Sequence, residues 1–217
     1  MMTGEGLGLD RTAAQPGGRS PAPGELAVVQ AFINSFFDLE GEWGADLFAT
    51  PDRLARWLLD RGLVAAGTTL RARDRTRALT VREGLRGLAA ANNEAWELVP
   101  AQELVLAGEA DPATSLAELN RAAGGARVDV HLDPDGPRFA ATGTGLDRAL
   151  GVLLAITATA MLDGSWRRLK ACPGHHCGWA FYDHSRNQTG RWCSMSVCGG
   201  RAKARAHYHR RREEDGG

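Results

Sequence analysis

Hydrophobic residues recur at helical spacing over much of the first 125 residues. In the first such stretch, residues 25–39, the apolar side chains on one face are Leu26, Val29, Phe32, Ile33 and Phe36. Thr50-Pro51-Asp52 predicts a second helix, because a hydroxyl N-cap, a proline at the first position and an acid in the first turn all favour a helix start. Gly62 is suited to end that helix.

Two further helix starts are predicted by capping boxes, in which a hydroxyl residue precedes a glutamate by three positions. The sequences TVRE and SLAE have this form and predict helices near residues 81–92 and 116–123, with Thr80 and Ser115 as N-caps. The segment LRARDRTRAL, residues 70–79, is dense in arginine. Its arginines form either a solvated helix face or an anion site.

The hydrophobic period changes from helical spacing to two in the segment VDVHLDPDGPRF, residues 128–139. Apolar and polar residues alternate on one side of a Pro-Asp-Gly turn, and Phe139 follows it, which predicts a β-hairpin. An apolar helix then opens at Thr144 or Gly145 and runs to Leu162. The expected fold class is α+β, mostly α: a helical N-terminal domain with one β-hairpin.

The first 24 residues are rich in Gly, Pro and Ala and are interpreted as a disordered lead. They contain no apolar run long enough for a signal peptide. The most apolar stretch, residues 146–162, includes Asp147 and Arg148 and is short for a membrane span, so it predicts a buried helix. We therefore expect a cytoplasmic protein with no membrane partner, and reduced thiols.

Charge divides the chain into an acidic and a basic part, although the formal net charge is +0. Residues 166–217 contain 11 Lys/Arg and 4 Asp/Glu, a net of +7, which leaves a net of −7 for residues 1–165. This asymmetry predicts a basic module at residues 166–217 that binds a polyanion, and this module is joined to an acidic body at residues 25–165.

All four cysteines lie in two Cys-x4-Cys pairs that are 15 residues apart: Cys172, Cys177, Cys193 and Cys198. Disulfides would need an oxidising compartment, and inert buried thiols would not need paired spacing. A structural site for one Zn²⁺ accounts for the pattern best, because four thiolates close a tetrahedron around this ion. No iron–sulfur spacing is present. Four thiolates leave no open coordination position, which predicts a structural rather than a catalytic metal.

Other side chains within the cysteine segment allow more than one interpretation. His175 and His176 lie inside the first pair and are either loop residues or replacements for one cysteine ligand. The aromatic residues between the pairs are Trp179, Phe181, Tyr182 and Trp192. They form either a small core around the metal or a surface on which nucleic-acid bases stack.

A basic helix is predicted directly after the last cysteine, over residues 201–212. Arg201, Arg205 and Arg212 fall on one face, and Lys203 and Arg210 extend it. A helix held rigidly at a zinc ligand can enter the major groove of DNA with its side chains already oriented. The rival interpretation is a solvated, frayed C-terminal helix.

Several of these residues resemble the CGNR zinc finger, a treble-clef-like module of bacterial proteins. The resemblance rests on Phe181, Asp183, Ser185, Asn187, Arg191-Trp192-Cys193-x-Met195 and Cys198-Gly199-Gly200-Arg201-x-Lys203. The stretches AFINSF, ADLFATPDRLARWLLDRGLV and VREGLRGLAAANN in turn resemble the ABATE domain. One signature position departs from the finger, since Gly200 stands where the family has asparagine, and a glycine near a helix start costs roughly 1 kcal/mol relative to alanine.

The resemblance implies a stress-responsive transcription regulator, with an N-terminal sensory domain coupled to a DNA-binding finger. It carries the zinc ligands over to the four cysteines. We expect contacts to double-stranded DNA from seven basic residues: Arg186, Arg191, Arg201, Lys203, Arg205, Arg210 and Arg212. The implied sensory role predicts a pocket for a small-molecule effector at Phe32, Asn34 and Trp57, although a satisfied core amide is the simpler role for Asn34.

The remaining predictions concern activity and partners. We expect no enzyme, because no nucleophile motif, phosphate loop or pair of catalytic carboxylates is found. Regulators extend their DNA site by dimerising, so a homodimer through the helical body is predicted. The bound form would then associate with the bacterial nucleoid. The rival hypothesis is a zinc-stabilised interaction or adaptor protein that does not bind nucleic acid directly.

Overall fold

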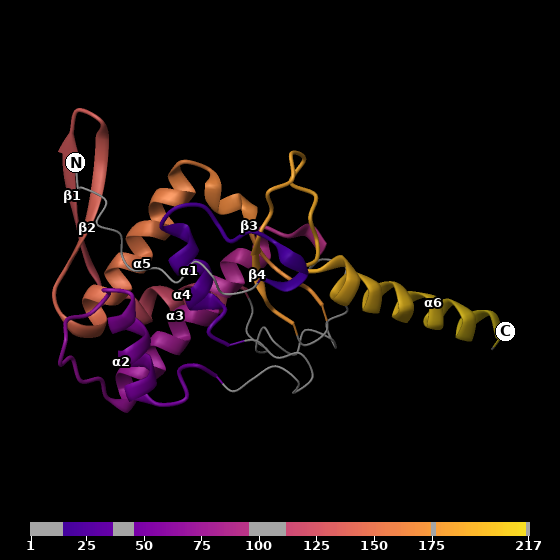
Figure 1. The fold of residues 1–217 in the computed structure, drawn as a ribbon, viewed down its shortest axis with the longest axis horizontal. Helices are drawn as coiled ribbons and strands as arrows, with labels where there is room; N and C mark the ends of the chain where they lie inside the picture. Colours follow the sequence, from indigo (N-terminus) through magenta and orange to yellow (C-terminus); the bar gives the residue numbers. More distant parts are fainter. Residues whose placement is uncertain (1–14, 37–45, 96–111, 175–176, 216–217) are drawn as a thin grey trace.

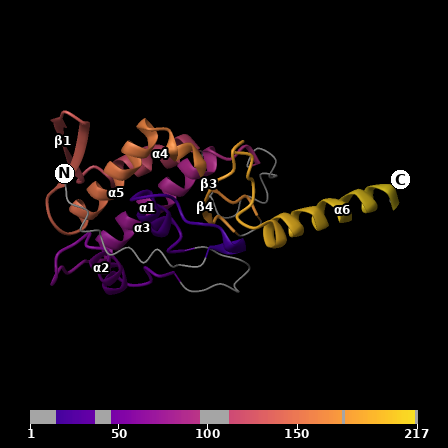
Figure 2. The ribbon, with the colours of Figure 1, turned by 45° about the horizontal axis from the view of Figure 1, so that its top comes forward.

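The computed structural model describes residues 15–36, 46–95, 112–174 and 177–215. Helices α1 to α5 gather into one body, and the β1–β2 hairpin extends from one end of it (Figure 1). The last helix, α6 (Gly200–Asp215), projects from the opposite end, away from the other described helices, in both views (Figures 1 and 2). The predicted fold class, mostly helical with one hairpin and a cysteine cluster, is confirmed.

The body is built from α1 (Leu26–Ile33), α2 (Pro51–Asp60), α3 (Ala72–Ala91), α4 (Pro112–Ala122) and α5 (Gly145–Leu162). Their apolar faces share one core. Near its centre three aromatic rings pack together, with centroid distances of 5.3 to 5.8 Å, and they belong to Phe32, Phe48 and Trp57.

Helix α1 ends earlier than the sequence predicts. The helix ends at Ile33 instead of Leu39, and residues 37–39 lie outside the described part of the chain. The reason is tertiary, because the guanidinium of Arg86 on α3 donates to the carbonyl oxygens of Ile33 at 2.8 Å and Phe36 at 2.6 Å. These hydrogen bonds satisfy backbone acceptors that a longer helix would have paired internally.

The predicted start of α2 is confirmed, whereas the predicted break before residue 81 is wrong. The hydroxyl of Thr50 accepts a hydrogen bond from the backbone N–H of Arg53 at 3.2 Å. Helix α3 instead runs unbroken through Thr80, whose hydroxyl donates to the carbonyl of Thr76 at 3.1 Å. Its N-terminus lies at Arg71, where the carboxylate of Asp74 accepts the backbone N–H at 2.8 Å. The arginine-dense segment thus forms the first turns of α3.

Helix α4 begins at Pro112, which is earlier than the predicted N-cap at Ser115. Proline is well suited to a first helical position, because its missing N–H would have no partner there. The helix packs against α3 at Gly84, where an added Cβ would lie 2.6 Å from the Cβ of Leu119. Glycine at this position therefore allows the two helices to approach closely.

The predicted hairpin is confirmed, with β1 (Arg127–Asp133) antiparallel to β2 (Gly136–Thr142). Gly136 closes the turn with a φ of +119°, a conformation that L side chains rarely adopt. The apolar side chains of the hairpin are less buried than period-two spacing predicts, because only the base of the hairpin packs on α5. Near the tip, Val130 is 58% and Leu132 is 82% exposed.

Helix α5 is the apolar helix that the sequence predicts. By length and composition it could cross a membrane, but half of its residues are buried inside the protein, as in the core helix of a globular domain. Leu146, Leu150 and Leu153 all lie in the shared core. This packing agrees with the sequence-based interpretation of a buried helix.

Residues 15–24 are ordered, whereas the sequence analysis assigned them to a disordered lead; residues 1–14 lie outside the description. They include a short 3-10 helix, Pro16–Gly18. The guanidinium of Arg19 donates to the carbonyls of Trp192 and Cys193, both at 2.9 Å, and lies 4.8 Å from the ring centroid of Phe181. Tertiary partners far along the chain therefore order a segment whose composition is typical of disorder.

The small sheet of β3 (Leu169–Ala171) and β4 (Ala180–Tyr182) joins the body to the cysteine segment. Alternate residues of a strand point to opposite faces. Leu169, Ala171, Ala180 and Tyr182 belong to the core of the body, while Phe181 packs with the cysteines. The two strands thus belong to the core of the body on one face, while a second hydrophobic cluster surrounds the cysteines on the other.

Candidate metal centre

The four cysteine sulfurs converge on one point. Their Sγ atoms all lie within 4.8 Å of one another, and every one of the residues is buried. The Sγ of Cys193 lies 3.6 Å from the Sγ of both Cys177 and Cys198. A tetrahedron with zinc–sulfur bonds of about 2.3 Å has edges of about 3.8 Å. The donor set and spacing therefore fit one structural Zn²⁺, as the sequence predicts.

The first cysteine pair is positioned by a tight turn between β3 and β4. The N–H of Cys172 donates to the carbonyl of Trp179 at 2.9 Å, and the N–H of Gly178 donates back to Cys172 at 3.2 Å. The N–H of Cys177 donates to Gly174 at 2.8 Å. An added Cβ on Gly174 would lie 2.9 Å from the sulfur of Cys198, so the backbone must pass close to the metal centre. His175 and His176 lie outside the described residues.

The second pair lies where the chain enters α6. Cys198 sits in a π-helical turn, Met195–Gly199, which leads directly into α6. Ser194 caps this turn, with its hydroxyl accepting the N–H of Val197 at 3.3 Å. The partial positive charge of a helix N-terminus stabilises thiolates. The metal centre therefore anchors the first turn of α6.

Three of the four cysteines have shifted pKa values. Hydrogen bonds with Cys172 and Cys198, together with burial, raise the pKa of Cys177 and of Cys193 above the usual range for a thiol. The pKa of Cys198 is lowered, because Cys172, Cys177 and Cys193 donate to its thiolate and the positive charge of Arg201 lies nearby. One thiolate is thus favoured by the cluster alone, and the full four-thiolate set requires a cation among the sulfurs.

The aromatic residues of the segment are mainly core residues. Trp179 and Phe181 are buried beside the cysteines, and Trp192 packs against them. The indole N–H of Trp179 also donates to the side chain of Gln15 at 3.0 Å. This burial favours the small-core interpretation over a surface for stacking bases.

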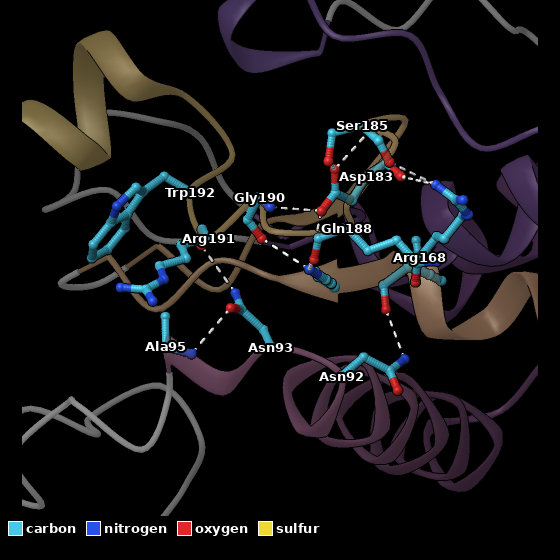
Figure 3. A network of polar contacts seen from close by, with 12 residues as sticks. Asn92, Asn93, Ala95, Arg168, Asp183, Ser185, Gln188, Gly190, Arg191 and Trp192 are labelled. Atoms are coloured by element: carbon cyan, nitrogen blue, oxygen red, sulfur yellow. Dashed lines mark hydrogen bonds and ion pairs between the residues drawn. The ribbon is translucent and has the colours of Figure 1, made fainter.

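A buried ion pair organises the loop that connects the two cysteine pairs (Figure 3). The ammonium of Lys170 lies 3.0 Å from the carboxylate of Asp183 and donates to the carbonyls of Gln188 and, at 3.1 Å, Gly190. The same carboxylate accepts the Gly190 N–H at 2.7 Å and the Ser185 hydroxyl at 2.6 Å. The loop thus closes on Asp183.

Asp183 is ionised in this environment although it is fully buried. Burial by itself would raise the pKa of the carboxyl group. The hydrogen bonds from Ser185, Lys170 and Gly190 outweigh burial and lower the pKa from 3.8 to about 2. The carboxylate is therefore a fixed negative charge that stabilises the loop by accepting hydrogen bonds.

The end of α3 holds the cysteine segment through two asparagines (Figure 3). The amide of Asn93 donates to the carbonyls of Ala171 at 2.8 Å and Arg191 at 2.9 Å, one residue before Cys172 and two before Cys193. The amide of Asn92 donates to Trp166 and Leu169 at 2.8 and 2.9 Å. Both cysteine pairs are thereby tied to the same helix of the body.

Helix α1 and Arg86 hold the other side of the segment. The amide of Asn34 makes reciprocal hydrogen bonds with the backbone of Ala180, accepting its N–H at 2.7 Å and donating to its carbonyl at 2.8 Å. Gln30 donates to the same carbonyl at 3.0 Å. Arg86, buried on α3, donates to the carbonyl of Gly178 at 2.5 Å. The body and the cysteine segment are thus joined by buried polar contacts as well as by a shared core.

Sequence reasoning missed the roles of Arg86 and of the Lys170–Asp183 pair, and it identified Asn93 as a core amide or helix cap without identifying its partners. A signal was available for Arg86, because it falls at helical spacing next to the buried positions Val81, Leu85 and Ala89. An arginine beside such a stripe indicates a buried partner. The distant partners of Lys170 and Asn93 left no comparable local pattern.

The residues predicted to contact DNA fall into two groups. Arg186 and Arg191 are exposed in the loop closed by Asp183. On α6, Lys203 is exposed and Arg201 and Arg205 are half-buried. Arg210 and Arg212 lie further along α6, and their side chains are outside the described set. Arg191 also lines a cavity of 450 Å³, together with Arg167 and Lys170.

Two of the residues predicted to form an effector pocket, Phe32 and Trp57, lie in the core, and Asn34 lies beside it. Phe32 and Trp57 stack in the aromatic cluster, while Asn34 is directed toward Ala180. None of the three lines the 450 Å³ cavity or a second one of 460 Å³ beside α2. These contacts favour a structural role for Asn34, the simpler of the two sequence-based interpretations.

Replacing Asn34 tests this structural role. Asn34→Ala removes both hydrogen bonds to buried Ala180, and we expect it to lower the free energy of unfolding by about 2 kcal/mol. Urea denaturation of the zinc-loaded protein measures the change. Asn120→Ala, an exposed position on α4, is the control and should change stability by less than about 0.5 kcal/mol. Equal stability of the two variants would contradict the assignment.

Comparison with known protein families agrees with this geometry. A model described as "CGNR zinc finger" matches residues 168–211, which include all four cysteines. A second model, ABATE, described as "Putative stress-induced transcription regulator", matches residues 26–164, more than half of the chain. No curated protein matches the sequence.

Proposed function

Since the chain belongs to the ABATE family and has a CGNR zinc finger, we propose that it is a zinc-dependent transcriptional regulator that binds double-stranded DNA. In this proposal the four cysteines hold one Zn²⁺, and α6 is the element that enters the major groove. The protein acts in the cytoplasm and associates with the nucleoid when it is bound to DNA. Neither matched family is described as an enzyme family, and a four-thiolate site leaves no open position for catalysis.

The observation that carries the proposal is the position of α6. The helix begins two residues after Cys198 and, among the described residues, projects away from the other helices (Figures 1 and 2). Its 16 residues extend for about 24 Å. An α-helix with its side chains fits the major groove, which is about 12 Å wide.

The charge of α6 favours a polyanion as its ligand. Its six basic residues are Arg201, Lys203, Arg205, Arg210, Arg211 and Arg212. Among the described side chains of this helix, Lys203, His207, Tyr208 and Arg211 are exposed. A helix with so few apolar residues gains little stability by packing on the body. Its basic surface is instead suited to binding an anionic partner.

The loop closed by Asp183 supplies a second basic surface. Arg186 and Arg191 project from it, and we assign them contacts to the phosphate backbone beside the groove that α6 occupies. Phosphate contacts of this kind set the register of a protein on the duplex. Arg201 lies close to Cys198, so part of its charge balances the zinc thiolates.

Salt-dependent binding tests the proposal. For Lys203→Ala/Arg205→Ala, we expect roughly tenfold weaker binding to duplex DNA at physiological salt, and a log–log salt slope smaller by about 2, since two phosphate contacts are lost. Fluorescence anisotropy of a labelled random-sequence duplex, titrated with zinc-loaded protein at several salt concentrations, gives both quantities.

The control removes the same charge from the body. Arg53→Ala/Arg56→Ala changes two exposed arginines of α2 and should leave affinity and salt slope unchanged. If the zinc-loaded wild type does not bind duplex DNA even at about 50 mM salt, DNA binding is excluded, and the rival interaction or adaptor role is favoured. If both double variants weaken binding equally, α6 is not the DNA-binding element.

Sensing by the body remains a prediction of the family resemblance. The buried contacts of Asn34, Arg86 and Asn93 with the finger support this prediction, because they couple the body to the finger. A ligand that shifted α1 or α3 would also shift the backbone beside the metal centre. The identity and binding site of an effector stay open to a thermal-shift screen of metabolites against the zinc-loaded protein.

A further inference from the structure

We infer that β1 is a dimerisation edge, along which two copies of the chain pair antiparallel about a two-fold axis at Val130. The pairing joins the two hairpins into one four-stranded sheet in the order β2-β1-β1-β2. This inference stands independently of DNA binding, because the hairpin and α6 lie at opposite ends of the molecule (Figure 1).

The edge of β1 is open in the described part of the chain. The strand pairs with β2 on one side and has no strand on the other. Val130 and Leu132 are 58% and 82% exposed, although β-branched and aliphatic side chains in a strand normally pack on a neighbour. An open edge with apolar side chains is a template for pairing with a further strand.

The alternation of hydrogen-bonded and non-hydrogen-bonded pairs along the hairpin determines which backbone groups of β1 face outward. Pro137, which has no N–H, lies opposite Leu132, so this pair is a non-hydrogen-bonded one. Because the two pair types alternate along an antiparallel ladder, the N–H and C=O groups of Val128, Val130 and Leu132 point away from β2. These three residues are therefore ready to bond a second strand.

The sequence of β1 is complementary to itself when read in the opposite direction. About a two-fold axis at Val130, the outward-facing residues pair with one another: Val130 with Val130 of the second copy, and Val128 with its Leu132. Their side chains lie on one face of the sheet, so the pairing packs Val130 against Val130 of the second copy and the exposed Leu132 against its Val128. Burial of this surface favours association.

Polar side chains also match in this register. Arg127 lies opposite Asp133 of the second copy, and Asp129 lies opposite its His131. All of these are non-hydrogen-bonded positions, where side chains of opposing strands come closest. Asp133 already binds Arg138 of its own hairpin at 2.5 Å, so Arg127 of the second copy would join an existing ion pair.

The same charges disfavour the neighbouring registers. A shift of two residues in one direction places Asp129 opposite Asp129 of the second copy. A shift in the other direction places His131 opposite His131, and Asp129 opposite Asp133. Like charges directly opposite one another destabilise a strand pair, and a shift of one residue would mismatch the backbone donors and acceptors. One register is therefore selected, and it is symmetric.

The solution mass of the full zinc-loaded chain tests the inference in the absence of DNA. We expect a dimer of twice the chain mass of 23.2 kDa in sedimentation or light-scattering measurements at micromolar concentration. His131→Asp places two pairs of like charges across the axis and should raise the dimer dissociation constant roughly tenfold. Asp129→Lys/His131→Asp exchanges the charges and should restore the wild-type value.

A backbone variant tests the hydrogen-bonding phase. Val130→Pro removes an N–H that points outward and not toward β2, so it should abolish the dimer while circular dichroism remains that of the folded chain. Two outcomes would overturn the inference: a wild type that is monomeric at about 100 µM, or a dimer whose mass and affinity survive both His131→Asp and Val130→Pro. The DNA affinity of α6 is a separate measurement, so either proposal can fail alone.

Discussion

Removal of zinc is expected to unfold the finger and to destabilise the body together with it. The metal is the main source of stability for residues 172–198, because these residues have only a few buried aromatic side chains around the cysteines. Zinc binding to finger peptides is worth on the order of 10–16 kcal/mol at neutral pH. Without the ion, the sulfurs lose the cation that holds them together as thiolates, and the pKa of Cys177 is raised while that of Cys198 is lowered.

The loss should spread because the finger and the body share a core. Leu169, Ala171, Ala180 and Tyr182 are buried among the side chains of the body. The carbonyls of Ala180 and Ala171 also bind Asn34 and Asn93. If β3 and β4 separate, these amides and their apolar neighbours become exposed to water.

Chelation and Cys177→Ser should both lower the midpoint of thermal unfolding by roughly 10 °C or more. Elemental analysis of untreated protein should find one zinc per chain. Hydrogen exchange should show lost protection in α1 and at the end of α3, as well as in the finger. Re-addition of Zn²⁺ after chelation should restore the midpoint, while Mg²⁺ should not. A chelated protein with an unchanged midpoint would refute both the metal site and the shared core.

Lys170→Met is expected to cost about 3–5 kcal/mol of stability, which is the second-largest effect. Lys170 is buried and pairs with Asp183, whose carboxylate is fully buried. Methionine fills a similar volume but leaves a charge with no cationic partner. The carbonyls of Gln188 and Gly190 also lose their donor, so the loop that holds Arg186 and Arg191 should open.

Urea denaturation of the zinc-loaded variant measures the cost. Lys203→Met makes the same chemical change at an exposed position on α6 and should alter stability by less than about 0.5 kcal/mol. Identical denaturation midpoints for the two variants would show that the Lys170–Asp183 pair contributes nothing to the fold. Restoration of stability in Lys170→Arg would support the role of the positive charge.

Local signals in the sequence were reliable where the chain satisfies its own backbone. Thr50 caps α2 as predicted because its acceptor and the N–H it binds lie three residues apart. The hairpin is also local, since its turn and its cross-strand pairs lie within residues 127–142. The cysteine spacing was informative for a related reason, because each pair brings two ligands together within one turn.

Local signals failed where a distant residue competed with them. The TVRE sequence has the form of a capping box, but the buried positions of α3 continue through it as Ala78, Val81 and Leu85, and packing keeps the helix intact. The end of α1 is decided by Arg86, which lies about fifty positions away. Asn34 was identified as an unusual polar residue, yet its partner, Ala180, could not be read from its neighbours.

The sequence by itself determined the metal chemistry, the hairpin and the basic helix after Cys198, because ligand type, turn residues and charge act over a few positions. Only the tertiary structure decided that residues 15–24 pack on the finger, that Lys170 and Asp183 form a buried pair, and that β1 keeps an edge with no strand from the described residues. Each of these depends on contacts between segments that are far apart in the sequence. Local residue patterns do not show which distant segments come into contact.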